Sequence, residues 1–220
     1  FQLSDASQPR VFDFAPGADK VKSVAVGGTT VAHTYVTDHI VVPASALTTG
    51  TNEVRIEFTA GDASLNRNPD FLYALFVPAR AHLAVPVFDQ PDLKAKWRLI
   101  LNIPKDWTAV SNGTQAGRTD MPTHTGLVFD QTPPIPTYLF SFAAGKFTID
   151  TDVRAGRTFR MLHREADAAK LARNRQAIYD LHAQALAFLE GYTAIPYPFE
   201  KFDFVAIPSF QFGGMEHPGS

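Results

Sequence analysis

The sequence contains no cysteine among its 220 residues, and this absence excludes several kinds of site. Without a thiol there is no disulfide framework, no thiol nucleophile and no cysteine-based zinc or iron–sulfur centre. A large excess of one sign of charge is also absent, because 20 basic and 22 acidic side chains leave a net charge of −2. Lys and Arg form no block, so the charge pattern predicts no nucleic-acid partner.

Long apolar runs are also absent, since none approaches the roughly 20 residues that span a bilayer. The sequence has no initiator Met and no signal-like leader, and residues 1–3 already resemble a strand. What is present is ordinary globular composition, with 45% hydrophobic and 19% charged residues. We therefore expect a soluble piece of a larger protein with no membrane span in this segment, and the composition leaves its compartment open.

Alternating hydrophobicity fills the first two-thirds of the sequence. Residues 52–58 place Val54, Ile56 and Phe58 on one face and charged side chains on the other, which is typical of a strand with one wet face. Residues 97–103 repeat this pattern, and Pro104 ends it. Other strand-like runs are 21–26, 35–42, 71–77, 127–130 and 137–142, with turns at Gly27-Gly28, Asn112-Gly113 and Pro133-Pro134. Short strands with frequent turns predict a mainly β fold, an antiparallel sandwich or saddle of sheets.

The period changes after about residue 155. Apolar residues between 165 and 192 recur at helical spacing, which predicts a long amphipathic helix with one apolar stripe: Leu171, Ile178, Leu181, Ala185, Phe188 and Leu189. Glu165 and Asp167 suit its first turn, and Gly191 followed by two prolines suits its end. A strand is expected at 202–207. The change of period predicts a β domain over residues 1–153 and the beginning of a second domain over residues 154–220.

Most catalytic motifs are missing from the sequence. It contains no H-E-x-x-H, no phosphate loop, no complete dinucleotide fingerprint and no G-x-S-x-G elbow. His163 and His182 share no helical face, so we expect both to be surface histidines. Asn112-Gly113-Thr114 fits a glycosylation sequon, but Asn-Gly is first of all a turn former, and we favour the turn.

Two segments remain as candidates for chemistry. By itself, the run 78–95 is most simply a loop between strands, in which Asp89 and Asp92 cap turns and Pro91 fixes one. The run Gly213-Gly214-Met215-Glu216-His217 is in isolation a glycine-rich chain end. Two adjacent glycines also let a ligand backbone approach the main chain closely, because no Cβ stands in the way, and Glu216 offers a partner for a cation.

Together these segments resemble the zinc aminopeptidases of the aminopeptidase N family, the gluzincins that include leukotriene hydrolase. The family's loop P-x-x-A-R-x-x-F-P-C-F-D-E/Q-P-x-x-K-A matches residues 78–95, most closely over Phe88-Asp89-Gln90-Pro91-Asp92-Leu93-Lys94-Ala95. Three further matches follow in family order. They are Ser111-Asn112, then Tyr197-Pro198-Phe199-Glu200-Lys201-Phe202-Asp203 for Y-P-F-x-K-x-D, and then Val205-Ala206-Ile207-Pro208 leading to residues 213–217 for G-x-M-E-N.

The resemblance implies a fold and a function. Residues 154–220 would begin an α+β thermolysin-like catalytic domain and stop before its zinc site. The main chain of Gly213, Gly214 and Met215 would line the path of an extended peptide substrate, and Glu216 would hold the free α-ammonium group of that peptide. Zinc, its ligands and the general base would come from sequence beyond Ser220. The chain would then contain no catalytic residue and no metal ligand, and we expect it to be inactive alone.

Four positions depart from the family pattern. His217 stands where Asn is usual, Leu75 and Val77 stand where a Q-x-E motif has Gln and Glu, and Val87 replaces a Cys. We include Leu75, Val77 and His217 in the expected substrate-binding set, and Leu75 suggests a more apolar first pocket. Two other interpretations remain open: a non-catalytic aminopeptidase-like scaffold that binds proteins, and an unrelated β-sandwich binding module.

Overall fold

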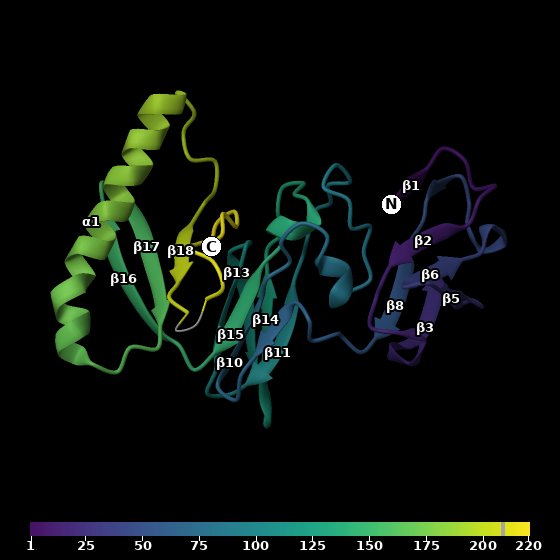
Figure 1. Ribbon diagram of the computed structural model, residues 1–220, viewed down its shortest axis with the longest axis horizontal. Coiled ribbons are helices and arrows are strands. Elements are labelled where there is room, and N and C mark those ends of the chain that lie inside the picture. The colour runs from purple at the N-terminus through teal and green to yellow at the C-terminus, as the bar shows by residue number, and fades with distance from the viewer. Residues whose placement is uncertain (208–209) are drawn as a thin grey trace. The chain divides into compact units, whose positions relative to one another are not determined.

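The computed structural model describes residues 1–207 and 210–220 (Figure 1). Pro208, part of one family-like motif, lies outside the described residues. The chain is mainly β with one long helix, as the sequence predicts. It divides into two compact units, the first made of residues 1–67, 74–95 and 134–139 and the second of residues 68–73, 96–133 and 140–220.

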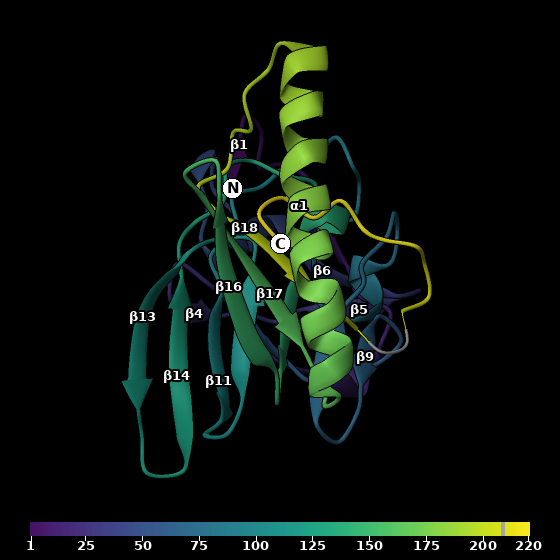
Figure 2. The same cartoon turned by 90° about the vertical axis from the view of Figure 1, so that its left-hand side faces the viewer.

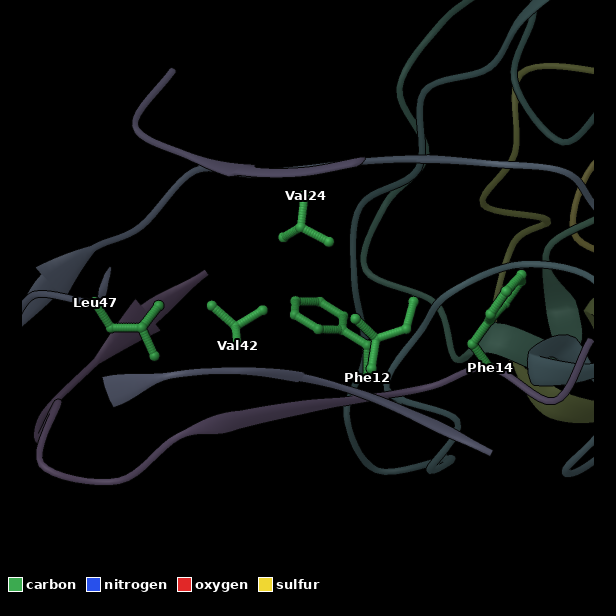
Figure 3. Close-up of a cluster of buried hydrophobic side chains, with 6 residues drawn as sticks. Phe12, Phe14, Val24, Val42 and Leu47 are labelled. Carbon is green, nitrogen blue, oxygen red and sulfur yellow. The ribbon is translucent and has the colours of Figure 1, made fainter. Parts of the chain in front are cut away.

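The first unit is built from short strands around one apolar core. Its strands are β1 (Gln2–Leu3), β2 (Arg10–Asp13), β3 (Val21–Val26), β4 (Thr29–Thr30), β5 (Thr34–Val36), β6 (His39–Val42), β7 (Gly50–Thr51), β8 (Val54–Phe58) and β9 (Leu65–Arg67). Strand orders are β2-β6-β5, β4-β3-β8 and β1-β7. Figure 3 shows the core side chains, which include Phe12, Phe14, Val24 and Val42. The alternation predicted for β8 is confirmed, because its three apolar residues pack against this core while Arg55 and Glu57 are exposed.

The single strand predicted over 35–42 is wrong, because the run is a hairpin. Strands β5 and β6 pair antiparallel across Thr37 and Asp38, whose φ angles of 46° and 63° are left-handed. Two consecutive left-handed residues form the tight turn that matches strand twist, and glycine is its usual sequence signal. The chain closes this turn without glycine, and the Tyr35 hydroxyl supports it by donating to the Phe14 carbonyl at 2.7 Å.

The second unit contains the remaining strands and the helix. They are β10 (Phe71–Ala74), whose last residue belongs to the first unit, β11 (Ile100–Pro104), β12 (Thr108–Ser111), β13 (Gln115–Asp120), β14 (His124–Phe129), β15 (Phe142–Gly145), β16 (Thr148–Arg154), β17 (Arg157–His163), α1 (Ala168–Thr193) and β18 (Phe202–Val205). Strand β15 lies between β10 and β12, and its small residues permit close packing. A Cβ on Gly145 would lie 2.5 Å from the Phe71 Cβ, so glycine is required there.

The strand predicted over 137–142 is also wrong. Residues Thr137–Leu139 form a short 3-10 helix, and strand β15 begins only at Phe142. Pro136 begins this turn, and its carbonyl accepts from the Leu139 amide at 3.2 Å. Proline favours such turns because its ring fixes φ.

Strands β16, β17 and β18 form a sheet with α1 beside it (Figure 2). A two-residue turn at Ala155-Gly156, with φ angles of 49° and 75°, joins β16 to β17. Strand β18 then pairs parallel to β17, and α1 forms the crossover that a parallel connection needs. Tyr179 and Leu186 of the helix pack with Phe159 and Met161 of β17.

The helix ends differ from those predicted. Asp167 is the N-cap, where its carboxylate accepts from the Lys170 amide at 3.0 Å, and Glu165 precedes the helix instead of lying in its first turn. Gly191 lies inside the helix, which continues to Thr193 and ends at Ala194 with φ 55°. A left-handed alanine is rare, so this end had no sequence signal.

The predicted apolar stripe is only partly correct. Leu171 and Ile178 pack against the sheet, but Leu181, Phe188 and Leu189 are 64%, 69% and 52% exposed, and Ala185 is exposed. The buried side chains of the helix are Tyr179 and Leu186, and ion pairs to β16 accompany this packing. Arg175 bonds Asp150 of β16 at 2.7 Å, and the Arg154 side chain reaches Asp180 at 2.7 Å. Two of the six predicted stripe residues therefore face the sheet, and the other four are exposed.

Both histidines predicted to be on the surface are enclosed. His163 ends β17 with 4% exposure, and its Nδ1 accepts from the Glu165 amide at 3.2 Å. His182 is half-buried on α1, where its ring stacks on Phe204 with 4.3 Å between centroids. The surface prediction is wrong for His163, which is buried at the end of a strand, and His182 is only partly exposed because Phe204 of the sheet covers its ring.

Candidate functional site

The loop 78–95 of the first unit is organised around the buried carboxylate of Asp89. One oxygen accepts from the His82 amide at 3.0 Å and contacts its Nδ1 at 2.6 Å, and the other accepts from the Thr137 hydroxyl at 2.7 Å. The Asp89 amide donates to Asp13 at 2.8 Å, and the neighbouring Phe88 stacks on Phe12. With its side chain 3% exposed, Asp89 fixes the loop and offers little to a ligand.

Leu75 and Val77 lie in the first unit, just after β10. Leu75 is 3% exposed, and its amide donates to the Ser64 carbonyl at 3.0 Å, whereas Val77 is half-buried. Of the two positions, Val77 therefore presents more accessible surface, and that surface is apolar.

Gly213 and Gly214 lie on the surface of the second unit without a local reason to be glycine. Both are exposed, neither has a positive φ, and a Cβ built on either would meet nothing within 4 Å. Other glycines are explained by the fold: a Cβ on Gly113 would lie 2.1 Å from the Asp130 carbonyl oxygen. The open space at residues 213–214 leaves room for a second backbone to approach this main chain.

Glu216 and His217 follow, the first exposed and the second half-buried. Glu216 is exposed, so its carboxylate is available to a cation, and Met215 beside it is half-buried. Burial lowers the pKa of His217 to about 4, against the smaller opposing effect of the Glu216 charge. Within the described part of the chain, the buried Nε2 of His217 has no hydrogen-bond partner. His217 is therefore neutral at pH 7, and the carboxylate of Glu216 supplies the charge of this segment.

A surface hollow of about 320 Å³ lies in the second unit, lined by three turns: residues 112–114, 130–133 and 198–201, with Pro218. Among described residues it touches none of positions 213–217. Asn112 on its wall is 8% exposed, and the chain bends at Asn112-Gly113, where a turn was predicted. Its amide is bonded within the protein, which supports the turn over glycosylation.

Among residues 1–207 and 210–220, no three or more His, Asp or Glu side chains are grouped to hold a metal ion. A search of the same residues finds no helix long and apolar enough to cross a membrane.

Comparison with known proteins identifies the family. Residues 29–139 match the Peptidase M1 N-terminal domain, and residues 178–220 match the Peptidase family M1 domain. The chain belongs to the peptidase M1 family. This confirms the resemblance to the aminopeptidase N family and the predicted fold class. The first match includes the Asp89 loop with Leu75 and Val77, and the second includes residues 213–217.

Named M1 relatives come from distant organisms. The chain is 30% identical over 145 residues to Aminopeptidase M1-A of Oryza sativa subsp. japonica, covering 66% of the chain and 16% of the relative. It is 31% identical over 146 residues to Aminopeptidase N of Homo sapiens, covering 64% and 15%. It is 30% identical over 159 residues to Tricorn protease-interacting factor F2 of Thermoplasma volcanium, covering 71% and 19%. The chain thus spans less than a fifth of the length of these relatives.

Asn112 and Lys201 are the side chains whose importance the sequence understated. Each matched a family-like pattern, but neither carried a predicted role. Both bond the main chain that follows residue 217. Their partners lie 106 and 18 residues away, so no local pattern marks these contacts.

Proposed function

We propose that the protein containing this chain is a zinc aminopeptidase that removes amino-terminal residues from peptides, and that residues 213–217 help to bind the peptide. The main chain of Gly213, Gly214 and Met215 lies along the substrate, and Glu216 holds its α-ammonium group. Leu75, Val77 and His217 complete the proposed substrate-binding set. The proposal is carried by the pair of exposed glycines with open space above them, followed directly by an exposed carboxylate.

An ammonium group recognised by a carboxylate fixes where a peptide is cut. A charge-assisted hydrogen bond to Glu216 anchors the free amino end, and only the first peptide bond then lies at a constant distance from the anchor. Zinc, when bound by the whole enzyme, polarises the scissile carbonyl and activates water. The described residues offer no ligand set for it, so the proposed part of this chain is substrate binding. The boundary between the β domain and the catalytic domain is proposed at residues 153–154.

Glu216→Gln in the full-length protein tests this proposal. Hydrogen bonds to charged groups are worth about 1.5–3 kcal/mol, so the KM for a fluorogenic aminoacyl substrate is expected to rise roughly 10- to 100-fold. The exposed Glu200→Gln is the matched control and leaves KM unchanged. A full-length protein that turns over no aminoacyl substrate, or a Glu216→Gln variant with an unaltered KM, would contradict the proposal.

A non-catalytic scaffold is the second candidate, and the apolar side chains of Leu75 and Val77 favour it. These positions lack the amide and the second carboxylate of the family's Q-x-E pattern, which weakens amine recognition. Zinc analysis of the full-length protein separates the candidates. One zinc ion per chain supports the enzyme, and its absence supports the scaffold. In the 220-residue chain itself we expect neither stoichiometric zinc nor turnover.

A further inference from the structure

The main chain that follows His217 is held by side chains from two different parts of the second unit. The Asn112 Nδ2 donates to the Pro218 carbonyl at 3.0 Å. The Lys201 Nζ donates to the Gly219 carbonyl at 2.8 Å, and the Asp203 amide donates to the same oxygen at 3.2 Å. Figure 1 shows this end of the chain beside β18. We call Asn112 and Lys201, with these two bonds, the tail clamp.

Asn112 is a rigid half of the tail clamp. Its Oδ1 accepts from the Ser141 amide at 2.7 Å, so the orientation of the side-chain amide is fixed from behind. Gly219 packs directly on it with φ 77°, and a Cβ there would lie 2.7 Å from the Asn112 carbonyl oxygen. The close approach at Gly219 therefore depends on glycine and brings the tail within reach of the Asn112 amide.

Lys201 is the charged half of the tail clamp. Its side chain is 12% exposed and bonds the Asp203 carboxylate at 2.7 Å, while Arg160 bonds the same carboxylate through its Nε at 2.7 Å. Burial lowers the pKa of Lys201 although Asp203 opposes the shift. Two cations share one carboxylate here, and among the described residues Lys201 also bonds the tail whereas Arg160 does not. Arg160 therefore provides a matched comparison.

The tail clamp sits at one end of an otherwise exposed span. At the other end, the Phe210 ring contacts the Tyr73 ring with 5.6 Å between centroids. Between them, residues 211–214 and Glu216 are exposed, and two of these are glycine. An exposed segment of this kind loses backbone entropy when a ligand orders it, and anchoring its ends beforehand reduces that cost.

We propose that Asn112 and Lys201 are positioning residues that fix the segment 213–217 for the amino terminus of a peptide, an inference that rests on the proposed function. Neither side chain touches substrate. They act through Pro218 and Gly219, two and three residues beyond Glu216, and hold the carboxylate where the ammonium group binds. Loss of either bond leaves the fold of the second unit in place and loosens the segment.

Hydrogen exchange of residues 210–220 tests the tail clamp independently of any activity. Asn112→Asp keeps the acceptor for Ser141 but removes the donor to Pro218, and Lys201→Met removes the bond to Gly219. We expect these amides to exchange about tenfold faster in both variants. Ser111→Ala deletes a neighbouring buried bond to Ser141 at 2.8 Å, and Arg160→Met deletes the second partner of Asp203. Both controls leave exchange of this segment unchanged, and equal exchange in variants and controls overturns the proposal.

Kinetics of the full-length protein provide the second readout. A misplacement of about 1 Å can cost on the order of 100-fold, and we expect the smaller displacement of a loosened segment to raise KM for an aminoacyl substrate about tenfold while kcat changes little. Ser111→Ala and Arg160→Met keep the wild-type KM. An unchanged KM in both tail-clamp variants overturns the proposal. If Asn112→Asp does not fold, the KM of Lys201→Met alone tests the proposal. A wild-type protein without turnover contradicts the proposed function instead, and hydrogen exchange still decides whether the tail clamp exists.

Discussion

His217 couples the stability of the chain to pH. Its pKa falls from 6.5 in the unfolded chain to about 4 in the folded one, because burial disfavours the imidazolium. The unfolded chain therefore binds more protons between these values, and the contribution of His217 is complete above pH 6.5 and lost as pH falls toward 4. Each pKa unit corresponds to about 1.4 kcal/mol, which gives a loss of about 3 kcal/mol at most.

Urea unfolding of the wild type and His217→Asn at pH 7 and pH 4.5 measures this contribution. Between pH 7 and pH 4.5 we expect the free energy of unfolding to fall by about 2 kcal/mol more in the wild type than in the variant, because Asn does not titrate. His33→Asn in the first unit is the control. The same pH dependence in His217→Asn and wild type would contradict the assignment.

Single residues also show where sequence reasoning reaches its limit. The Asn112-Gly113 turn was predictable, because both residues favour turns and Gly113 is required by the nearby Asp130 carbonyl. The bonds that Asn112 makes to residues 29 and 106 positions away were not, because they depend on tertiary placement. In isolation the glycine pair at 213–214 was most simply a glycine-rich chain end, and the substrate path came from the family resemblance; among the described residues, a Cβ on either glycine would meet nothing within 4 Å.

At the scale of elements, Gly191 lowers the stability of α1. This residue is exposed inside the helix, and a Cβ there would meet nothing within 4 Å. Glycine in a helix interior costs up to about 1 kcal/mol relative to alanine, so Gly191→Ala is expected to stabilise the chain by about 0.5–1 kcal/mol in urea unfolding.

Gly145→Ala is the opposing control for that measurement. Its added Cβ meets Phe71 Cβ at 2.5 Å, so we expect destabilisation of about 2 kcal/mol or more. A destabilised Gly191→Ala variant would show that the helix does not continue through residue 191.

Elements were predictable wherever local pattern and tertiary packing agree. Strand β8 alternates because one face meets a core, and the sequence shows the same alternation. The buried face of α1 was not predictable from apolar spacing, because Tyr179 and Leu186 lie against the sheet while most of the predicted stripe is exposed. The turns at Thr37-Asp38 and Pro136 broke predicted strands, since neither carries the glycine that usually marks such a turn.

At the scale of the whole molecule, a near-neutral chain displays several large apolar side chains along one helix. Leu181, Phe188, Leu189 and Tyr192 are each more than half exposed, and the net charge is −2. Exposed apolar surface with little net charge favours self-association and dye binding.

Fluorescence of the dye ANS with the 220-residue chain measures this surface. Phe188→Glu is expected to reduce ANS binding and leave the free energy of unfolding within about 0.5 kcal/mol, because the side chain is 69% exposed. Leu186→Ala on the same helix is the control. Leu186 is 8% exposed, so this variant is expected to lose about 2–5 kcal/mol of its free energy of unfolding without a reduction in ANS binding. Unchanged ANS binding in Phe188→Glu would show that this face is covered.

The bond from Asn112 to Pro218 has a consequence for folding during protein synthesis. Pro218 lies 106 positions after Asn112, so at translation rates of about 5–20 residues per second it is added about 5–20 seconds later. All residues of the first unit have been made once residue 139 has been added, whereas the second unit includes residues 140–220. During synthesis the first unit can therefore fold early. Asn112 of the second unit cannot form its bond until Pro218 has been made.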